Sequence, residues 1–176
     1  MAAAALPSMA GLWERARISS AAGDLAATLR AARSNAAAHG RSVGVVFDRN
    51  AGGWSCRSYA DGDGDGIRTA DIASGVDLPL GPPARIGERW PGVDLGFPDV
   101  PRLRRVPPST GWVASLVDPV QFGTTDIVSF SPRGEASSGT IYLSDGRGQG
   151  AAVTVYGPAA RVRALRYDTP NERWLP

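Results

Sequence analysis

One long helical pattern near the start of the chain constrains the fold more than any other feature. Residues 8–39 are rich in Ala, and the Gly40 that follows is typical of a helix end. A helix of this span would be about 48 Å long at 1.5 Å per residue. That is more than a domain of this size needs, so we expect only part of it to pack on the domain. The positions that we expect to pack step along one helix face, and they are Ile18, Ala22, Leu25, Leu29, Ala32 and Ala36.

The beginning of this helical pattern differs from the rest. Residues 1–13 are small and apolar, and no charge occurs before Glu14. This run is too short to span a membrane, which takes about 20 residues, and it lacks the basic and strongly apolar regions of a secretory signal. We therefore expect it to be the lower part of a longer apolar helix whose membrane-anchoring part is missing here. The segment before Glu14 should project or fray, with few tertiary contacts.

The apolar period changes from helical to alternating after Gly40. Two alternating stretches separated by turn residues predict a β-hairpin. Four more strands are indicated later in the chain, and the short Gly-rich turns between them favour antiparallel pairing. The expected strands are residues 43–48, 54–59, 127–130, 140–143, 152–156 and 161–167.

Nine prolines lie between the two groups of strands, all within residues 78–119. Few helices or central strands tolerate that density, so we expect irregular loops there, with short strands at most, for instance around residues 93–97. Residues 168–176 are expected to form a polar tail. The whole pattern predicts an α+β fold, in which a long N-terminal helix (residues 1–40) packs on the antiparallel sheet or sheets of a globular β domain (residues 41–176).

Charge and cysteine usage exclude several classes of protein. The net charge is only +2, which is too small to indicate nucleic-acid binding by itself. All 19 basic residues are Arg, which favours planar, bidentate contacts or reflects the composition of the genome. One cysteine, Cys56, and one histidine, His39, provide neither an internal disulfide nor a zinc site. We find no spaced nucleophile and base, so the sequence predicts that the protein is not an enzyme.

The sharpest local motif is the run DGDGDG. Asp61, Asp63 and Asp65 occupy alternate positions, as the first oxygen ligands of a calcium loop do. A calcium loop of the EF-hand type has a Glu ligand at position 12, but this chain has Ile72 there. A shortened loop would use Asp71 as the ligand instead. A solvated Asp-Gly turn gives the same pattern without a metal. We predict that no cofactor is required, and that calcium at Asp61, Asp63, Asp65 and Asp71 is the candidate ion.

Arginines near the C-terminus form a second candidate site. Arg161 and Arg163 alternate along an expected strand, so both leave the same face, and Arg166 and Arg173 follow closely. Guanidinium groups in such a cluster can pair with phosphates and give salt-sensitive DNA binding. The RLRR run at residues 102–105 would extend this patch if it lies nearby. The alternative is a solvated strand face with acidic neighbours.

Three segments of the chain together resemble one known family. They are the helix-to-strand junction LRAARSNAAAHGRSV, the hairpin FSPRGEASSGTIYL and the late strands AAVTVYGPAARVRALRY. In these segments the chain resembles the GspH/FimT family, whose members are minor pilin-like proteins of type II secretion systems and type IV pili. The resemblance implies a pilin-like fold. It also implies that the apolar half of the helix first anchors the subunit in the inner membrane and later packs in the filament core.

The resemblance implies a structural role. We expect a minor pseudopilin of a type II secretion pseudopilus, which assembles through its N-terminal helix and contacts partner pseudopilins or a secreted substrate. Its expected location is the inner membrane of a Gram-negative bacterium, crossed once before assembly, with the globular domain in the periplasm.

Two alternatives stay open. The first is a FimT-like minor pilin of a type IV pilus that binds DNA for uptake through C-terminal arginines. The family's GRxR-like motif reads here as Ala160-Arg161-Val162-Arg163, with Ala160 in place of the glycine. Salt-dependent DNA binding that is lost on replacing Arg161 and Arg163 by Ala would favour this reading. The second, more distant alternative is a separate calcium-binding adhesion module.

Overall fold

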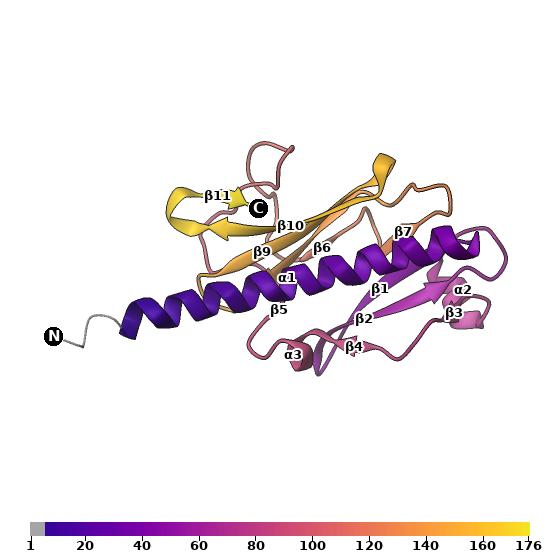
Figure 1. Ribbon diagram of the computed structural model, residues 1–176, viewed down its shortest axis with the longest axis horizontal. Helices are drawn as coiled ribbons and strands as arrows, with labels where there is room; N and C mark the ends of the chain where they lie inside the picture. Colours follow the sequence, from indigo (N-terminus) through magenta and orange to yellow (C-terminus); the bar gives the residue numbers. More distant parts are fainter. Residues whose placement is uncertain (1–5) are drawn as a thin grey trace.

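The computed structural model describes residues 6–176, with side chains described from Gly11 onwards. It confirms the predicted α+β class, because one long helix lies across two antiparallel sheets (Figure 1). Helix α1 runs from Leu6 to His39, which is 34 residues. It ends at Gly40, whose φ of 64° is in the left-handed region that glycine adopts most easily. The N-terminal part of α1 extends beyond both sheets (Figure 1).

The first sheet is built around the predicted hairpin. Strands β1 (Val43–Asn50) and β2 (Gly53–Ala60) pair along their whole length. Strand β7 (Ile127–Phe130) joins the other side of β1. The two-residue strands β3 (Leu78–Pro79) and β4 (Ala84–Arg85) both pair with β2 and form the far edge.

The second sheet has the order β11-β10-β9-β8-β5, and β6 also pairs with β8. Its central strands follow one another along the chain, as short antiparallel connections predict. Its strands are β5 (Asp94–Leu95), β6 (Val120–Gln121), β8 (Gly139–Ser144), β9 (Gly150–Tyr156), β10 (Arg161–Asp168) and β11 (Arg173–Leu175).

Strand β5 lies within the short strand expected around residues 93–97, but several other short elements have no signal in the sequence pattern. The proline-rich stretch also holds β3, β4 and the short helix α3 (Ile86–Arg89). A second short helix, α2 (Thr69–Ser74), follows the Asp-Gly run. The tail predicted as merely polar pairs with β10 as β11. Elements of two to six residues are too short to show a period, so contacts with the rest of the fold define them.

The apolar stripe of α1 forms the centre of the main core. Small alanines let the helix backbone approach the sheets closely, and Phe47, Phe130 and Val153 complete the core from the sheet side. The six stripe positions are between 0% and 3% exposed, and they are Ile18, Ala22, Leu25, Leu29, Ala32 and Ala36.

A second, smaller core lies on the outer face of the second sheet. Tyr142, Tyr167 and Trp174 pack there with tilted rings, and Leu103 contributes from the proline-rich loop. The indole NH of Trp174 donates to the carbonyl of Arg104 at 2.7 Å. The proline-rich segment is therefore held down on the sheet by buried aromatic side chains.

Two arginines of α1 cover an open edge of the second sheet. Strand β10 pairs with β9 from Arg161 to Arg166, but β11 covers its other side only from Arg166 onwards. Arg30 donates to the carbonyl of Val162 at 3.1 Å, and Arg33 donates to the carbonyl of Ala160 at 3.3 Å. Charged side chains at an open edge discourage pairing with another chain.

Removing these two donors should loosen this edge. We expect the double variant Arg30→Met/Arg33→Met to lose about 1–2 kcal/mol of unfolding free energy, because two side-chain hydrogen bonds disappear while the aliphatic stems remain. Its open edge should also increase self-association. Urea denaturation and sedimentation velocity measure the two effects. Arg15→Met, at an exposed position of the same helix, is the control, and equal behaviour of both variants would contradict the assigned role.

Candidate functional site

The projecting end of α1 presents an apolar surface. Leu12 is 61% exposed and Trp13 is 72% exposed. Among the side chains described, from Gly11 onwards, the first ion pair between α1 and the rest of the fold joins Glu14 to Arg147, on the loop after β8, at 3.0 Å. Further along, the indole NH of Trp90 donates to the carboxylate of Asp24 at 3.1 Å. The helix is thus held from Glu14 onwards, while the turn before it stays uncovered.

A hollow of about 670 Å³ lies beside this end of the helix. Trp13 and Arg17 line it from α1, and Trp90 and Arg147 line it from the opposite loops. The backbone is helical from Leu6, so the expected projection is observed, and fraying before Leu6 falls outside the described residues. Among the described helices, none is both long enough and apolar enough to cross a membrane.

The Asp-Gly run forms a loop that is organised by its own carboxylates. Asp61 is only 5% exposed. Its carboxylate accepts hydrogen bonds from the backbone NH groups of Asp63 at 3.2 Å, Gly64 at 2.7 Å and Gly66 at 3.0 Å. Burial opposes ionisation of Asp61, but these NH groups outweigh it and lower its pKa below the ordinary value.

A second buried carboxylate closes this loop. Asp77 is 1% exposed and accepts hydrogen bonds from the NH groups of Gly62 at 3.2 Å and Arg68 at 3.1 Å. A Cβ at Gly62 would collide with the carbonyl of Val76, so only glycine fits there. The sequence motif suggested metal ligands and gave no sign of this role for Asp77.

The structure brings together three of the four residues predicted to bind calcium. Ligand atoms of Asp61, Asp63 and Asp65 lie within 4.8 Å of one another. Asp71 is not in this group; its carbonyl instead accepts the NH groups that follow α2. Asp65 forms an ion pair with Arg68. Partial desolvation, together with the charge of Asp63, raises the pKa of Asp65 against the effect of Arg68.

Calcium binding by this loop stays a prediction. The hydrogen bonds that Asp61 accepts explain the loop conformation without an ion. A bound calcium ion would, however, reduce the repulsion between the three neighbouring carboxylates. If the loop binds calcium, millimolar calcium should raise the melting temperature of the wild type but not that of Asp63→Ala. Thermal denaturation with magnesium in place of calcium is the control. No rise in the wild type would exclude the ion.

The four C-terminal arginines do not share one face. The register of β9 and β10 pairs Arg161 with Tyr156 and Arg163 with Thr154, on the face away from α1. By the same alternation Arg166 lies on the helix side. Arg173, on β11, forms an ion pair at 3.4 Å with Asp168, which lies directly opposite it on β10. The candidate DNA-binding set is therefore divided into an outer pair and an inner pair.

The RLRR run is organised around an aromatic ring. The guanidinium groups of Arg102 and Arg104 lie 4.0 and 4.2 Å from the ring centroid of Trp112. Arg105 donates from its Nε to the Trp112 carbonyl at 3.1 Å, and Arg102 also pairs with Glu172 at 3.5 Å. The sequence indicated the RLRR run but not its contact with Trp112. That contact depends on the fold of the loop, which brings Arg104 and Trp112 together in a β-bridge.

Comparison with known proteins gives one match. A family model described as type II transport protein GspH matches residues 21–158. The matched region covers the packed half of α1 and both sheets as far as the turn after β9, and it ends before the C-terminal arginines. No curated protein and no solved structure matches the chain.

Proposed function

The chain belongs to the GspH family of type II transport proteins, and we propose that it acts as a minor pseudopilin within a type II secretion pseudopilus. The observation that carries this proposal is the family match over most of the helix and both sheets. The GspH family is one of structural pseudopilins, so we assign no catalytic step to the chain.

Helix α1 would be the assembly element of this subunit. Its projecting turn exposes Leu12 and Trp13, apolar side chains of the kind that pack between subunits. From Ile18 onwards one face of α1 packs against both sheets, with Leu25 and Leu29 fully buried. Because the packed half cannot shift without disturbing the core, a displacement of α1 in a growing filament would carry the β domain with it.

Membership of the GspH family supports a location for the subunit. We propose that the subunit is anchored in the inner membrane before assembly, and that the β domain faces the periplasm. Partner pseudopilins would meet the helix, and partner pseudopilins or a secreted protein would meet the exposed domain.

Site-specific crosslinking in cells tests the assembly role. A photo-reactive amino acid at position 13 of the full-length protein should capture other pseudopilins of the same secretion system. Position 117 is the control, because Val117 is 81% exposed on a loop of the β domain. Capture of no pseudopilin from position 13 in correctly localised protein would overturn the proposal.

A DNA-binding minor pilin remains the second candidate function. The exposed pair Arg161 and Arg163 on one strand face favours it, because both guanidinium groups can reach the same ligand. We expect such binding to weaken with salt and to be lost in Arg161→Ala/Arg163→Ala but not in Arg166→Ala. Mobility-shift assays with duplex DNA measure it, and no binding at low salt would exclude this function.

A further inference from the structure

A groove crosses the outer face of the second sheet, on the side away from α1. It consists of two hollows, of about 620 and 320 Å³. They adjoin each other, because Val106, Ser109 and Thr140 line both. One wall is the proline-rich loop and the other is the end of β9 and the start of β10.

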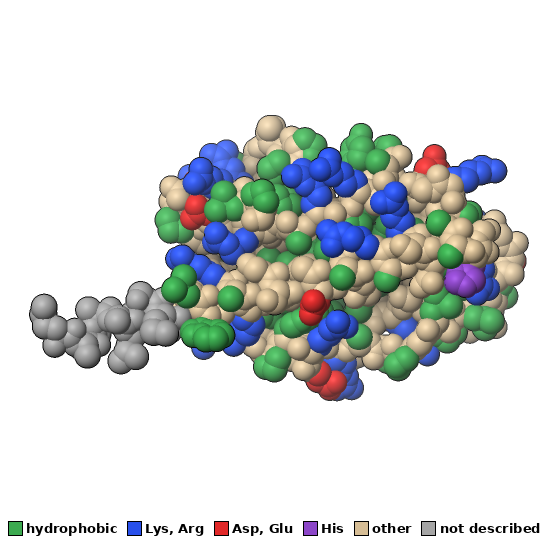
Figure 2. All heavy atoms as spheres, in the orientation of Figure 1, with side chains coloured by type: hydrophobic (Ala, Val, Ile, Leu, Met, Phe, Trp, Pro, Cys, Tyr) green, Lys and Arg blue, Asp and Glu red, His purple; other side chains and the backbone are tan. Residues whose placement is uncertain are grey.

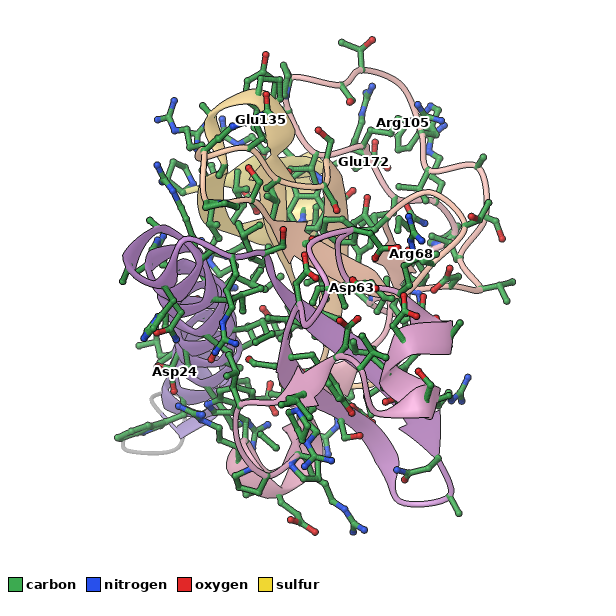
Figure 3. The ribbon with its side chains drawn as sticks, turned by 90° about the vertical axis from the view of Figure 1, so that its right-hand side faces the viewer. Asp24, Asp63, Arg68, Arg105, Glu135 and Glu172 are labelled. Carbon is green, nitrogen blue, oxygen red and sulfur yellow. The ribbon has the colours of Figure 1, made fainter. Side chains whose placement is uncertain are left out.

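The charge along this groove is entirely positive. Arg161 and Arg163 line the larger hollow and Arg105 lines the smaller one, and no acidic side chain lines either. Figure 3 shows Arg105 on the side of the molecule away from α1. Within residues 6–176, none of these three arginines takes part in an ion pair. The groove therefore has positive charge that nothing in the described chain neutralises.

The walls of the groove are also apolar. Pro107 and Pro108 form one side together with Val106. Tyr156, on the other side, is 55% exposed and offers an aromatic face to a ligand. Hydroxyl groups of Thr140 and Thr154 line the space between the walls. Exposed aromatic and proline side chains beside arginines are typical of surfaces that bind other proteins.

We propose that this groove binds an extended, acidic segment of a partner protein. Arg161 and Arg163 are two residues apart on one strand, so their positions are about 7 Å apart. An extended segment presents alternate side chains at the same interval, so two of its carboxylates can each meet one guanidinium group. Apolar side chains of the segment would fill the space between Pro108 and Tyr156. The inference rests on the proposed function, in which the exposed β domain meets partners.

The same observations favour a protein over a nucleic acid. Affinity for DNA grows with the number of phosphates that basic side chains neutralise, and only three arginines line this groove. The sugar-phosphate backbone would also leave the apolar walls unfilled. An acidic segment with apolar residues would pair with the arginines and also pack against the apolar walls of the groove.

Fluorescence anisotropy with a labelled peptide, in which Asp alternates with Leu, tests the groove on the whole chain. We expect saturable binding that weakens with salt. It should weaken about tenfold or more in Arg161→Gln/Arg163→Gln, which removes two charge-assisted contacts. Arg166→Gln, on the opposite face of the same strand, is the matched control and should bind normally. A peptide with Asn in place of Asp should bind poorly, and so should one with Ser in place of Leu.

Three results would contradict the binding of an acidic segment in this groove. They are equal binding of the Asn and Asp peptides, unchanged affinity in the double variant, and tighter binding of duplex DNA than of the peptide. Crosslinking from position 13 separates this inference from the proposed function. Normal crosslinks without peptide binding would contradict only the proposed binding in the groove. Peptide binding without crosslinks to pseudopilins would contradict the proposed pseudopilin role.

Discussion

Replacing Leu25 or Leu29 by Ala should lower the free energy of unfolding by about 2–5 kcal/mol in each case. Both side chains are fully buried where α1 meets the two sheets. Alanine would remove their apolar contacts and leave a cavity that helix and sheets, held at many other points, cannot close. Because α1 connects the core to the assembly surface, these variants should also loosen the coupling between helix and β domain.

Urea denaturation followed by circular dichroism measures this loss. Leu12→Ala is the matched control, since Leu12 lies on the same helix but is 61% exposed. The control should unfold like the wild type to within about 0.5 kcal/mol. A loss of unfolding free energy below about 1 kcal/mol for both Leu25→Ala and Leu29→Ala would show that these side chains are not packed tightly between α1 and the sheets.

The second large effect is expected at Asp61. Asp61→Ala should cost about 2–4 kcal/mol, because three backbone NH groups lose their carboxylate acceptor at once. The loop between β2 and α2 should then open. Asp63→Ala is the control, since the exposed Asp63 carboxylate accepts a bond only from the NH of Asp65. Proteolysis within residues 61–68 and urea denaturation both report the change, and equal stability of the two variants would contradict this role.

The same carboxylate makes stability depend on pH. The pKa of Asp61 is lowered in the folded state, so its contribution is fully present above its ordinary unfolded pKa, near 3.9. It disappears as the pH falls through the lower folded-state pKa, because protonation then removes the charged acceptor. Asp61→Asn should be less stable than the wild type at neutral pH, and the difference should shrink below about pH 4. A difference that stays constant with pH would show that the charge is unimportant.

The regular elements could be predicted from the sequence because their signals are local. The stripe that contains Leu25 and Leu29 follows the helical period, and Gly40 marks the end of the helix. Alternation gave the hairpin of β1 and β2. Cys56 lies on β2 and is 7% exposed, in line with the usual burial of cysteine. Burial raises the pKa of the Cys56 thiol, as expected of an unreactive core cysteine.

The candidate sites were harder to predict because they depend on contacts distant in sequence. The acidic run predicts either metal ligands or a solvated Asp-Gly turn, and the choice between them stays open. Nothing in the run shows that Asp61 and Asp77 accept hydrogen bonds from the loop backbone, because Asp77 lies beyond the motif. The alternation of Arg161 and Arg163 was visible, but nothing in the sequence shows that the proline-rich loop lies across the sheet from them. The arginines of the RLRR run contact Trp112 only because that loop folds back on itself.

Deletion of the gene in its own bacterium tests the central claim most directly. The measurement is the amount of a type II exoprotein in the medium and in the periplasm, with the wild-type gene restored as a control and DNA uptake measured in parallel. A minor pseudopilin predicts that the exoprotein accumulates in the periplasm while DNA uptake is unchanged. Normal secretion combined with a loss of DNA uptake would contradict the pseudopilin role and favour the DNA-binding pilin.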